Sequence, residues 1–226
     1  MEDIYKLVKD FFSHDMDLDD LFDSEAIIWI DWREDDEDVV RYFNDMIDEP
    51  IDIQTVSNGK PYGDDIVLKH GNKELQIPYD DEQDRDVTIK YFNDFVKPDY
   101  EVRWFAESLG NDTLGFTVLS GPEWAKLNDE FGADVVRYYF EPIDFESDMF
   151  NLGMDEVFAL LALRENSEGV NTQFSTQLDW IRIINKEKTL AEQKENGQID
   201  LKQYMVAKKE LQQIKDEFIA THGGME

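Results

Sequence analysis

The stretch Arg-Tyr-Phe-Asn-Asp at residues 41–45 returns 49 residues later as Lys-Tyr-Phe-Asn-Asp at residues 90–94. The likeness extends to both sides, because an apolar run and a group of acidic residues precede each copy and an alternating run follows it. Apolar residues recur at helical spacing within each copy, whereas the flanking runs are typical of strands. A repeat of this kind sets the unit of architecture. The sequence therefore predicts a duplicated strand-helix-strand unit, at residues 26–56 and 75–105, with the phenylalanine of each copy at an equivalent buried position.

Turn and cap residues divide the rest of the first 148 residues into short elements. Apolar runs at residues 66–68 and 75–77 flank a Gly-Asn turn and predict a hairpin. Ser120 and Glu123 have the spacing of a capping box and predict the start of a helix. The run Val-Val-Arg-Tyr-Tyr-Phe at residues 135–140 is rich in β-branched and aromatic residues and predicts a strand. Because neighbouring strands are joined by short turns, the predicted fold class is α+β, with a mixed, largely antiparallel sheet.

The sequence pattern changes near Met149, after which apolar residues follow helical spacing almost throughout. We therefore expect two domains: an acidic α+β domain with the internal repeat at residues 1–148, and a helical C-terminal region at residues 149–226 that ends in a helical hairpin.

The last segment of the chain has a recognisable order of residues. A leucine-containing helix ends at an Asn-Gly turn, and an Ile-Asp pair restarts the chain at residues 199–200. The pattern consists of residues 190–200 followed by Tyr204, Lys208, Leu211 and Ile214 at helical spacing. This pattern resembles the short C-terminal helical hairpin that terminates many bacterial proteins, and the resemblance implies docking or homo-oligomer formation. The alternative is an ordinary pair of helices on the surface of the domain.

Charge separates the chain into two parts. The 22 Lys and Arg residues stand against 53 Asp and Glu residues, which gives a net charge of −31. Residues 186–226 carry 7 basic and 8 acidic side chains, so almost the whole excess, −30, lies in residues 1–185. Such a field attracts basic proteins and repels nucleic acid and anionic lipid. We therefore expect a basic protein partner, no direct nucleic-acid binding and no membrane binding.

Composition also limits the compartment and the chemistry. The chain has no Cys, which excludes disulfides, thiolate metal sites and Cys nucleophiles and fits a reducing compartment. The amino terminus lacks the basic start and apolar run of a signal peptide, and no stretch has the roughly 20 apolar residues of a membrane span. These features predict a cytoplasmic protein.

Motifs for catalysis, cofactors and metals are missing from the sequence. The three His residues lie far apart, and no glycine-rich phosphate loop or Gly-x-Ser-x-Gly pattern occurs. Asp15, Asp17 and Asp19 match the first ligands of a calcium-binding EF-hand loop, but Asp20 and Ala26 stand where that loop needs Gly and Glu. We therefore predict no catalytic residue, no metal ligand and no cofactor, and interpret the acids near Asp17 as a helix cap or turn.

In its size, its acidity and its lack of Cys and of active-site motifs, the chain resembles the cytoplasmic immunity proteins of bacterial toxin systems. The resemblance implies a non-enzymatic protein that inhibits a basic partner, such as a nuclease toxin. Exposed acids would steer the encounter and aromatic residues would act as anchors. The candidate partner-binding residues are Asp35, Asp36, Asp38, Asp81, Glu82, Asp84, Trp32 and Tyr79.

Two other functions remain open from the sequence. The protein could be a nucleic-acid mimic that blocks DNA-binding proteins, which would require acids along a track with the spacing of phosphates. It could also be a carboxylate- or metal-dependent enzyme, because 53 acidic residues hide any catalytic pair.

Overall fold

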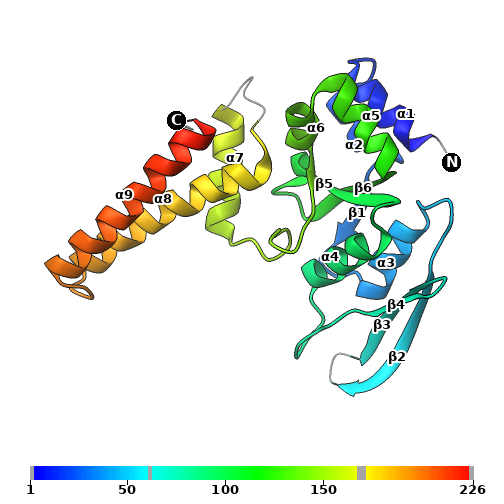
Figure 1. Cartoon of the computed structure of the whole chain (residues 1–226), viewed down its shortest axis with the longest axis horizontal. Coiled ribbons are helices and arrows are strands. Elements are labelled where there is room, and N and C mark those ends of the chain that lie inside the picture. The colour runs from blue at the N-terminus through cyan, green and yellow to red at the C-terminus, as the bar shows by residue number, and fades with distance from the viewer. Residues whose placement is uncertain (1–2, 61–62, 167–171, 224–226) are drawn as a thin grey trace. The chain divides into compact units, whose positions relative to one another are not determined.

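The computed structural model describes residues 3–60, 63–166 and 172–223. The chain divides into two compact units, Met1–Leu152 and Gly153–Glu226 (Figure 1). The boundary expected from the sequence, between residues 148 and 149, lies four residues earlier in the chain. The amino-terminal unit contains strands and helices, and the carboxy-terminal unit is helical, so the α+β class is confirmed.

The amino-terminal unit contains two separate sheets where the sequence predicted one. The larger has the strand order β1-β6-β5-β7, and the smaller has the order β2-β3-β4. Their bounds are β1 Ile28–Asp31, β2 Asp52–Lys60, β3 Gly63–His70, β4 Lys73–Gln76, β5 Tyr100–Phe105, β6 Thr113–Ser120 and β7 Phe140–Pro142. Every strand pairing in the described part of the chain is antiparallel.

Two helices, α3 (Asp36–Asn44) and α4 (Arg85–Val96), lie between the two sheets (Figure 1). Another set of helices covers the other face of the larger sheet: α1 (Ile4–Phe12), α2 (Leu18–Phe22), α5 (Gly121–Phe131) and α6 (Ala133–Tyr139), with the short 3-10 helix η1 (Ala106–Ser108) following β5. The capping box predicted at the start of α5 is present, with reciprocal bonds between Ser120 and Glu123. Both faces of the larger sheet are therefore covered.

The duplicated unit is longer than predicted and its two copies exchange strands. The first copy is β1-α3-β2-β3 and the second is β4-α4-β5-β6. In the larger sheet, β1 of the first copy pairs with β6 of the second. In the smaller sheet, β4 of the second copy pairs with β3 of the first. Each copy therefore supplies the first strand of a sheet whose hairpin belongs to the other copy.

The strand registers agree with this equivalence. The pair Gln54↔Val67 in the first hairpin corresponds to Arg103↔Thr117 in the second, with β2 displaced by 49 residues and β3 by 50. The exchanged pair Ile28↔Phe116 is repeated as well. Its counterparts are Ile77, 49 residues after Ile28, and Ile66, 50 residues before Phe116, and the backbone N–H of Ile77 donates to the carbonyl of Ile66 at 2.9 Å. Both the hairpin and the exchanged pairing are therefore repeated.

Equivalent residues of the two copies meet each other in the centre of the unit. Phe43 and Phe92 are both fully buried, as predicted, and their ring centroids are 5.6 Å apart. Asp36 and Arg85, also 49 residues apart, form an ion pair with 2.8 Å between Oδ1 and Nε. In a two-fold arrangement, residues near the axis contact their own counterparts. The two copies therefore pack about an approximate two-fold axis that passes between α3 and α4.

The predicted strand at residues 135–140 is wrong, because most of this run forms helix α6 and only its last residue enters β7. Val136 and Phe140 are the fully buried members of the run, and both belong to the hydrophobic cluster beneath α1 and α5. Residues four apart lie on one face of a helix, whereas a strand would place them on one face together with Tyr138. Burial against this cluster outweighs the strand preference of β-branched and aromatic residues.

The carboxy-terminal unit contains α7 (Met154–Asn166), α8 (Phe174–Glu195) and α9 (Leu201–His222). Helices α8 and α9 are joined by a short turn and contact each other through the rings of Trp180 and Phe218 and an ion pair between Lys215 and Glu187. In α9, which is described over its whole length, no residue is buried. A search of the described helices found none with the length and apolarity to cross a membrane.

Candidate partner-binding surface

Arg85 joins the segment before α3 to the first turn of α4. Its guanidinium donates from Nη1 to the carbonyl of Asp31 at 2.5 Å and from Nη2 to the carbonyl of Glu34, in addition to its ion pair with Asp36. The planar fork of Arg suits such a set of acceptors. Residues 31–36 are therefore held beside the start of α4, which brings the two acidic segments of the repeat together.

The structure contradicts the predicted role of Asp36 as an exposed acid. Asp36 is only 5% exposed, and its second carboxylate oxygen accepts a hydrogen bond from the Thr88 hydroxyl at 2.5 Å. A buried carboxylate requires partners of this kind because desolvation without them is costly. Asp36 therefore connects the two copies of the repeat and is not available to a partner.

Tyr79 is likewise buried within the unit, so the structure contradicts its use as an anchor for a partner. Its ring is 8% exposed, and its hydroxyl lies 2.7 Å from the hydroxyl of Thr88. Because Thr88 donates its one proton to Asp36, the Tyr79 hydroxyl donates to Thr88. Tyr79, Thr88, Asp36 and Arg85 form one buried polar network.

Trp32 has the exposure that a partner-binding anchor needs. Its side chain is 56% exposed, and its ring packs edge-to-face on Phe150 with 5.1 Å between centroids. Phe150 is buried, so it supports one side of the indole and leaves the other side in solvent. Trp32 is therefore a rigid, half-supported aromatic side chain beside the acidic segment that begins α3.

The remaining predicted acids lie around the starts of α3 and α4. Asp35, Asp81 and Glu82 are exposed, and Asp38 and Asp84 are half-buried. Asp35 occupies the N-cap position of α3 but makes no side-chain cap bond there, so its carboxylate faces solvent. We call Trp32 and these five acids, Asp35, Asp38, Asp81, Glu82 and Asp84, the Trp32 surface.

Asp84, which is half-buried, also has a structural role. It caps α4 by accepting from the backbone N–H of Val87 at 3.0 Å, and it accepts from Nδ2 of Asn151 at 3.0 Å. The second bond ties the start of α4 to the residue that follows Phe150. The segment that contains Phe150, on which Trp32 packs, is therefore hydrogen-bonded to the acidic start of α4.

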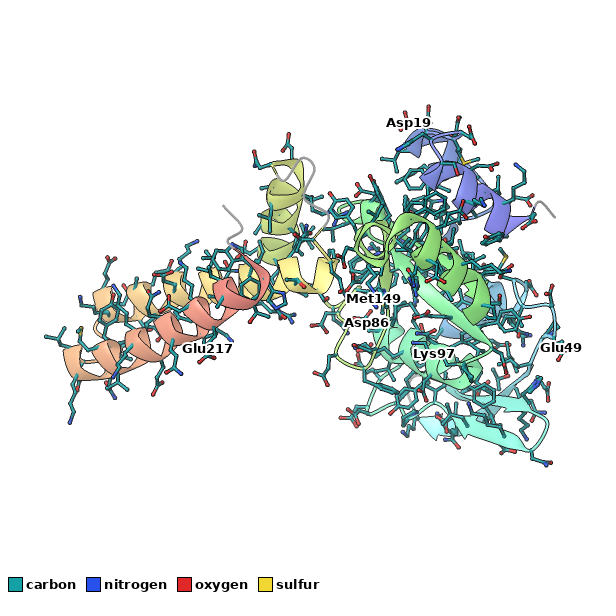
Figure 2. All side chains as sticks on the ribbon, turned by 45° about the horizontal axis from the view of Figure 1, so that its top comes forward. Asp19, Glu49, Asp86, Lys97, Met149 and Glu217 are labelled. Carbon is teal, nitrogen blue, oxygen red and sulfur yellow. The ribbon has the colours of Figure 1, made fainter. Side chains whose placement is uncertain are left out.

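Asp86 holds this support in place, and sequence reasoning missed it. Its carboxylate is 1% exposed and accepts backbone N–H bonds from Met149 at 3.0 Å, Phe150 at 2.8 Å and Asn151 at 3.2 Å (Figure 2). Burial raises the pKa of Asp86 above its ordinary value of 3.8, while the three N–H donors and Lys90 act in the opposite direction. Asp86 belongs to a run of acids at the start of a helix, and the sequence does not distinguish this buried acid from its exposed neighbours.

The raised pKa of Asp86 predicts an unusual dependence of stability on pH. The folded chain binds this proton more tightly than the unfolded chain, so the stabilisation is full below about pH 3.8 and is lost as pH rises through the folded pKa. We expect wild type to lose stability relative to Asp86→Asn as pH rises above about 3.8. Urea unfolding of both proteins at several pH values measures the difference, and a constant difference would contradict the assignment.

Of the three acids that match EF-hand ligand positions, Asp17 caps a helix. Asp17 is the N-cap of α2 and accepts from the backbone N–H of Asp20 at 2.8 Å. Among the residues that the structure describes, no group of three or more His, Cys, Asp or Glu side chains is arranged to hold a metal ion. The segment therefore forms a capped turn between α1 and α2.

A depression of about 500 Å³ lies where the ends of α3 and α4 approach the larger sheet, and Ile47, Val96 and Tyr100 are part of its lining. The carboxylates of Asp48, Glu49 and Asp99 also line it. All three are exposed, whereas a catalytic acid is usually desolvated enough to hold a proton. The depression therefore gives no support to a carboxylate enzyme.

Comparison of the chain with models of protein families, with curated proteins and with solved structures gave no match. The chemistry of the Trp32 surface is therefore the basis for a functional proposal.

Proposed function

We propose that this protein is a non-enzymatic, acidic binding protein that neutralises a basic protein partner in the cytoplasm, in the manner of the immunity proteins of bacterial toxin systems. The partner would be a nuclease or another toxin with a cationic active surface. The observation that carries the proposal is the combination of an exposed, supported tryptophan with exposed acids on the strongly acidic unit of the chain.

The charge is concentrated where this surface lies. The amino-terminal unit, Met1–Leu152, holds 13 Lys and Arg residues against 40 Asp and Glu residues, a balance of −27. The carboxy-terminal unit holds the remaining 9 basic and 13 acidic residues, a balance of −4. A field of this size accelerates association with a cationic protein. The amino-terminal unit is therefore the proposed recognition unit.

An interface also needs an anchor that is desolvated on binding, because exposed charges contribute mainly to the rate of encounter. Trp32 meets this need, since its ring packs edge-to-face against Phe150 and a partner would cover its exposed part. The acids around it would then lie at the rim of the interface.

We propose a different role for the carboxy-terminal unit, which is to form a homo-oligomer through its helices. Large apolar side chains are exposed on it, including Met154, Phe158, Leu201, Met205 and Val206. Exposed apolar residues grouped on one unit are typical of interaction surfaces. Its weak charge would limit repulsion between the subunits.

Affinity capture from the source cell tests both roles with three baits: the whole chain, a variant with Asp35→Lys and Glu82→Lys, and a chain ending at residue 152. We expect the whole chain and the shortened chain to recover the same basic protein and to inhibit its activity. The charge-reversed variant should recover little of it. Light scattering should show a smaller assembly for the shortened chain.

Two results would contradict these proposals. A partner recovered equally by the whole chain and the charge-reversed variant would remove the Trp32 surface from recognition. A shortened chain with the same number of subunits as the whole chain would show that the C-terminal helices do not form the oligomer.

A further inference from the structure

The two-fold repeat shows that one strand edge is occupied in the larger sheet and open in the smaller one. In the larger sheet, β7 pairs with the outer edge of β5 through Arg103, Trp104 and Phe105. The equivalent positions on β2, 49 residues earlier, are residues 54–56. In residues 3–60, 63–166 and 172–223, β2 pairs with β3 alone, and residues 54–56 are all exposed. The outer edge of β2 is therefore the unoccupied counterpart of the β5 edge.

The backbone groups on this edge can be identified from two asparagines at equivalent positions. In the second copy, Asn93 accepts from the backbone N–H of Val102 at 2.8 Å, on the side of β5 away from β6. In the first copy, Asn44 accepts from the N–H of Ile51 at 2.8 Å and donates to its carbonyl at 3.0 Å. Because backbone groups alternate in direction along a strand, the N–H and C=O of Ile53 and Thr55 also point away from β3. These N–H and C=O groups could form hydrogen bonds with another strand placed beside β2.

The charge beside the two edges has opposite sign. Next to β7, Lys97 donates from Nζ to the carbonyl of Ile143, just beyond the end of the strand, at 3.3 Å. Its equivalent in the first copy is Asp48, which is exposed and is followed by the exposed Glu49. A segment entering beside β2 would therefore meet carboxylates where β7 meets an ammonium group.

We infer that the outer edge of β2 binds an extended, basic segment of the partner protein, which pairs antiparallel with β2 as β7 pairs with β5. The inference rests on the proposed function and names the part of the partner that is recognised. Main-chain hydrogen bonds supply affinity in this mode, and neighbouring side chains supply specificity. The amino-terminal unit of a second chain fits this edge poorly, because that unit carries a net charge of −27 on each chain.

A pair of synthetic peptides separates strand pairing from charge attraction. One is an octapeptide of alternating Lys and Thr, and the other has the same side chains with every backbone nitrogen methylated, which removes all main-chain donors and keeps the charge. We expect the unmethylated peptide to bind the whole protein about tenfold more tightly than the methylated one, because it makes additional main-chain hydrogen bonds. Its binding should also slow hydrogen exchange at the amides of Ile53 and Thr55.

A matched pair of variants tests the position of the ladder. Thr55→Pro removes the outward N–H, which an edge strand tolerates because that group makes no bond within the sheet. Thr55→Val changes the side chain and keeps the N–H. We expect Thr55→Pro to reduce the difference between the two peptides and Thr55→Val to retain it in full, with circular dichroism establishing that both variants are folded.

The possible failures have different meanings. If both peptides bind wild type equally, charge alone attracts them, which overturns the strand pairing and leaves the proposed function intact. If Thr55→Pro instead dissociates a dimer formed without peptide, the occupant of the edge is a second copy, which also overturns the inference. If neither peptide binds at low salt, the electrostatic basis of the proposed function fails as well.

Discussion

Replacing Asp36 by alanine is expected to lower the free energy of unfolding of the amino-terminal unit by about 3–5 kcal/mol. The replacement leaves the Arg85 guanidinium without its carboxylate in a largely buried position, since the side chain of Arg85 is only 13% exposed. It also removes the acceptor that lies 2.5 Å from the Thr88 hydroxyl, whose remaining acceptor is the carbonyl of Asp84 at 3.0 Å. Removing one partner of a buried ion pair costs more than the pair contributes, because the other charge remains desolvated.

The matched control for this experiment is Asp35→Ala. It removes the same charge one residue away, from a carboxylate that is exposed and makes no cap bond, so we expect a change within about 0.5 kcal/mol. Both variants relieve the general repulsion among acids to a similar extent, which leaves the buried pair as the difference. Urea unfolding followed by circular dichroism measures it, and equal stability of the two variants would contradict a structural role for Asp36.

Reversing the charges of Asp35 and Glu82 to lysine is expected to slow association with the proposed basic partner by about tenfold to a hundredfold at low ionic strength. Both side chains are exposed, so the variant should keep the wild-type fold. Removing two negative charges and adding two positive ones lowers the attraction that brings the molecules together. The difference should shrink above about 0.5 M salt, where charges separated by more than a few ångströms are screened.

Stopped-flow measurement of the association rate at several salt concentrations tests this expectation with the captured partner. The variant Trp32→Ala provides the contrast, because loss of the anchor should mainly increase the dissociation rate and leave the salt dependence of association unchanged. If charge reversal leaves the association rate unchanged at low salt, the acids of the Trp32 surface do not steer the encounter.

The positions of the main elements followed from local sequence patterns. Apolar residues at helical spacing and the proline after each helix located α3 and α4 closely enough to place Phe43 and Phe92 on buried faces. The recurrence of one motif 49 residues later revealed the duplication. These signals depend on nearby residues alone, and a sequence therefore displays them directly.

The pairing of the strands could not be obtained in the same way. That β1 joins β6 and β4 joins β3 depends on contacts between residues far apart in the chain, and the two sheets result from this exchange. The run at residues 135–140 shows the same limit, since its conformation was decided by the cluster that Val136 and Phe140 enter.

The acidity of the chain, the location of its charge, the repeat and the helical character of its last third could all be obtained from the sequence. The tertiary structure was needed to show which of these acids are exposed and which are buried within the fold. Asp35, Asp36 and Asp86 all lie in acidic runs of the sequence. In the structure, however, Asp35 is exposed, Asp36 forms an ion pair with Arg85, and Asp86 accepts hydrogen bonds from three backbone N–H groups. The physical reason is that desolvation and its compensating partners depend on neighbours in space, which local sequence patterns do not specify.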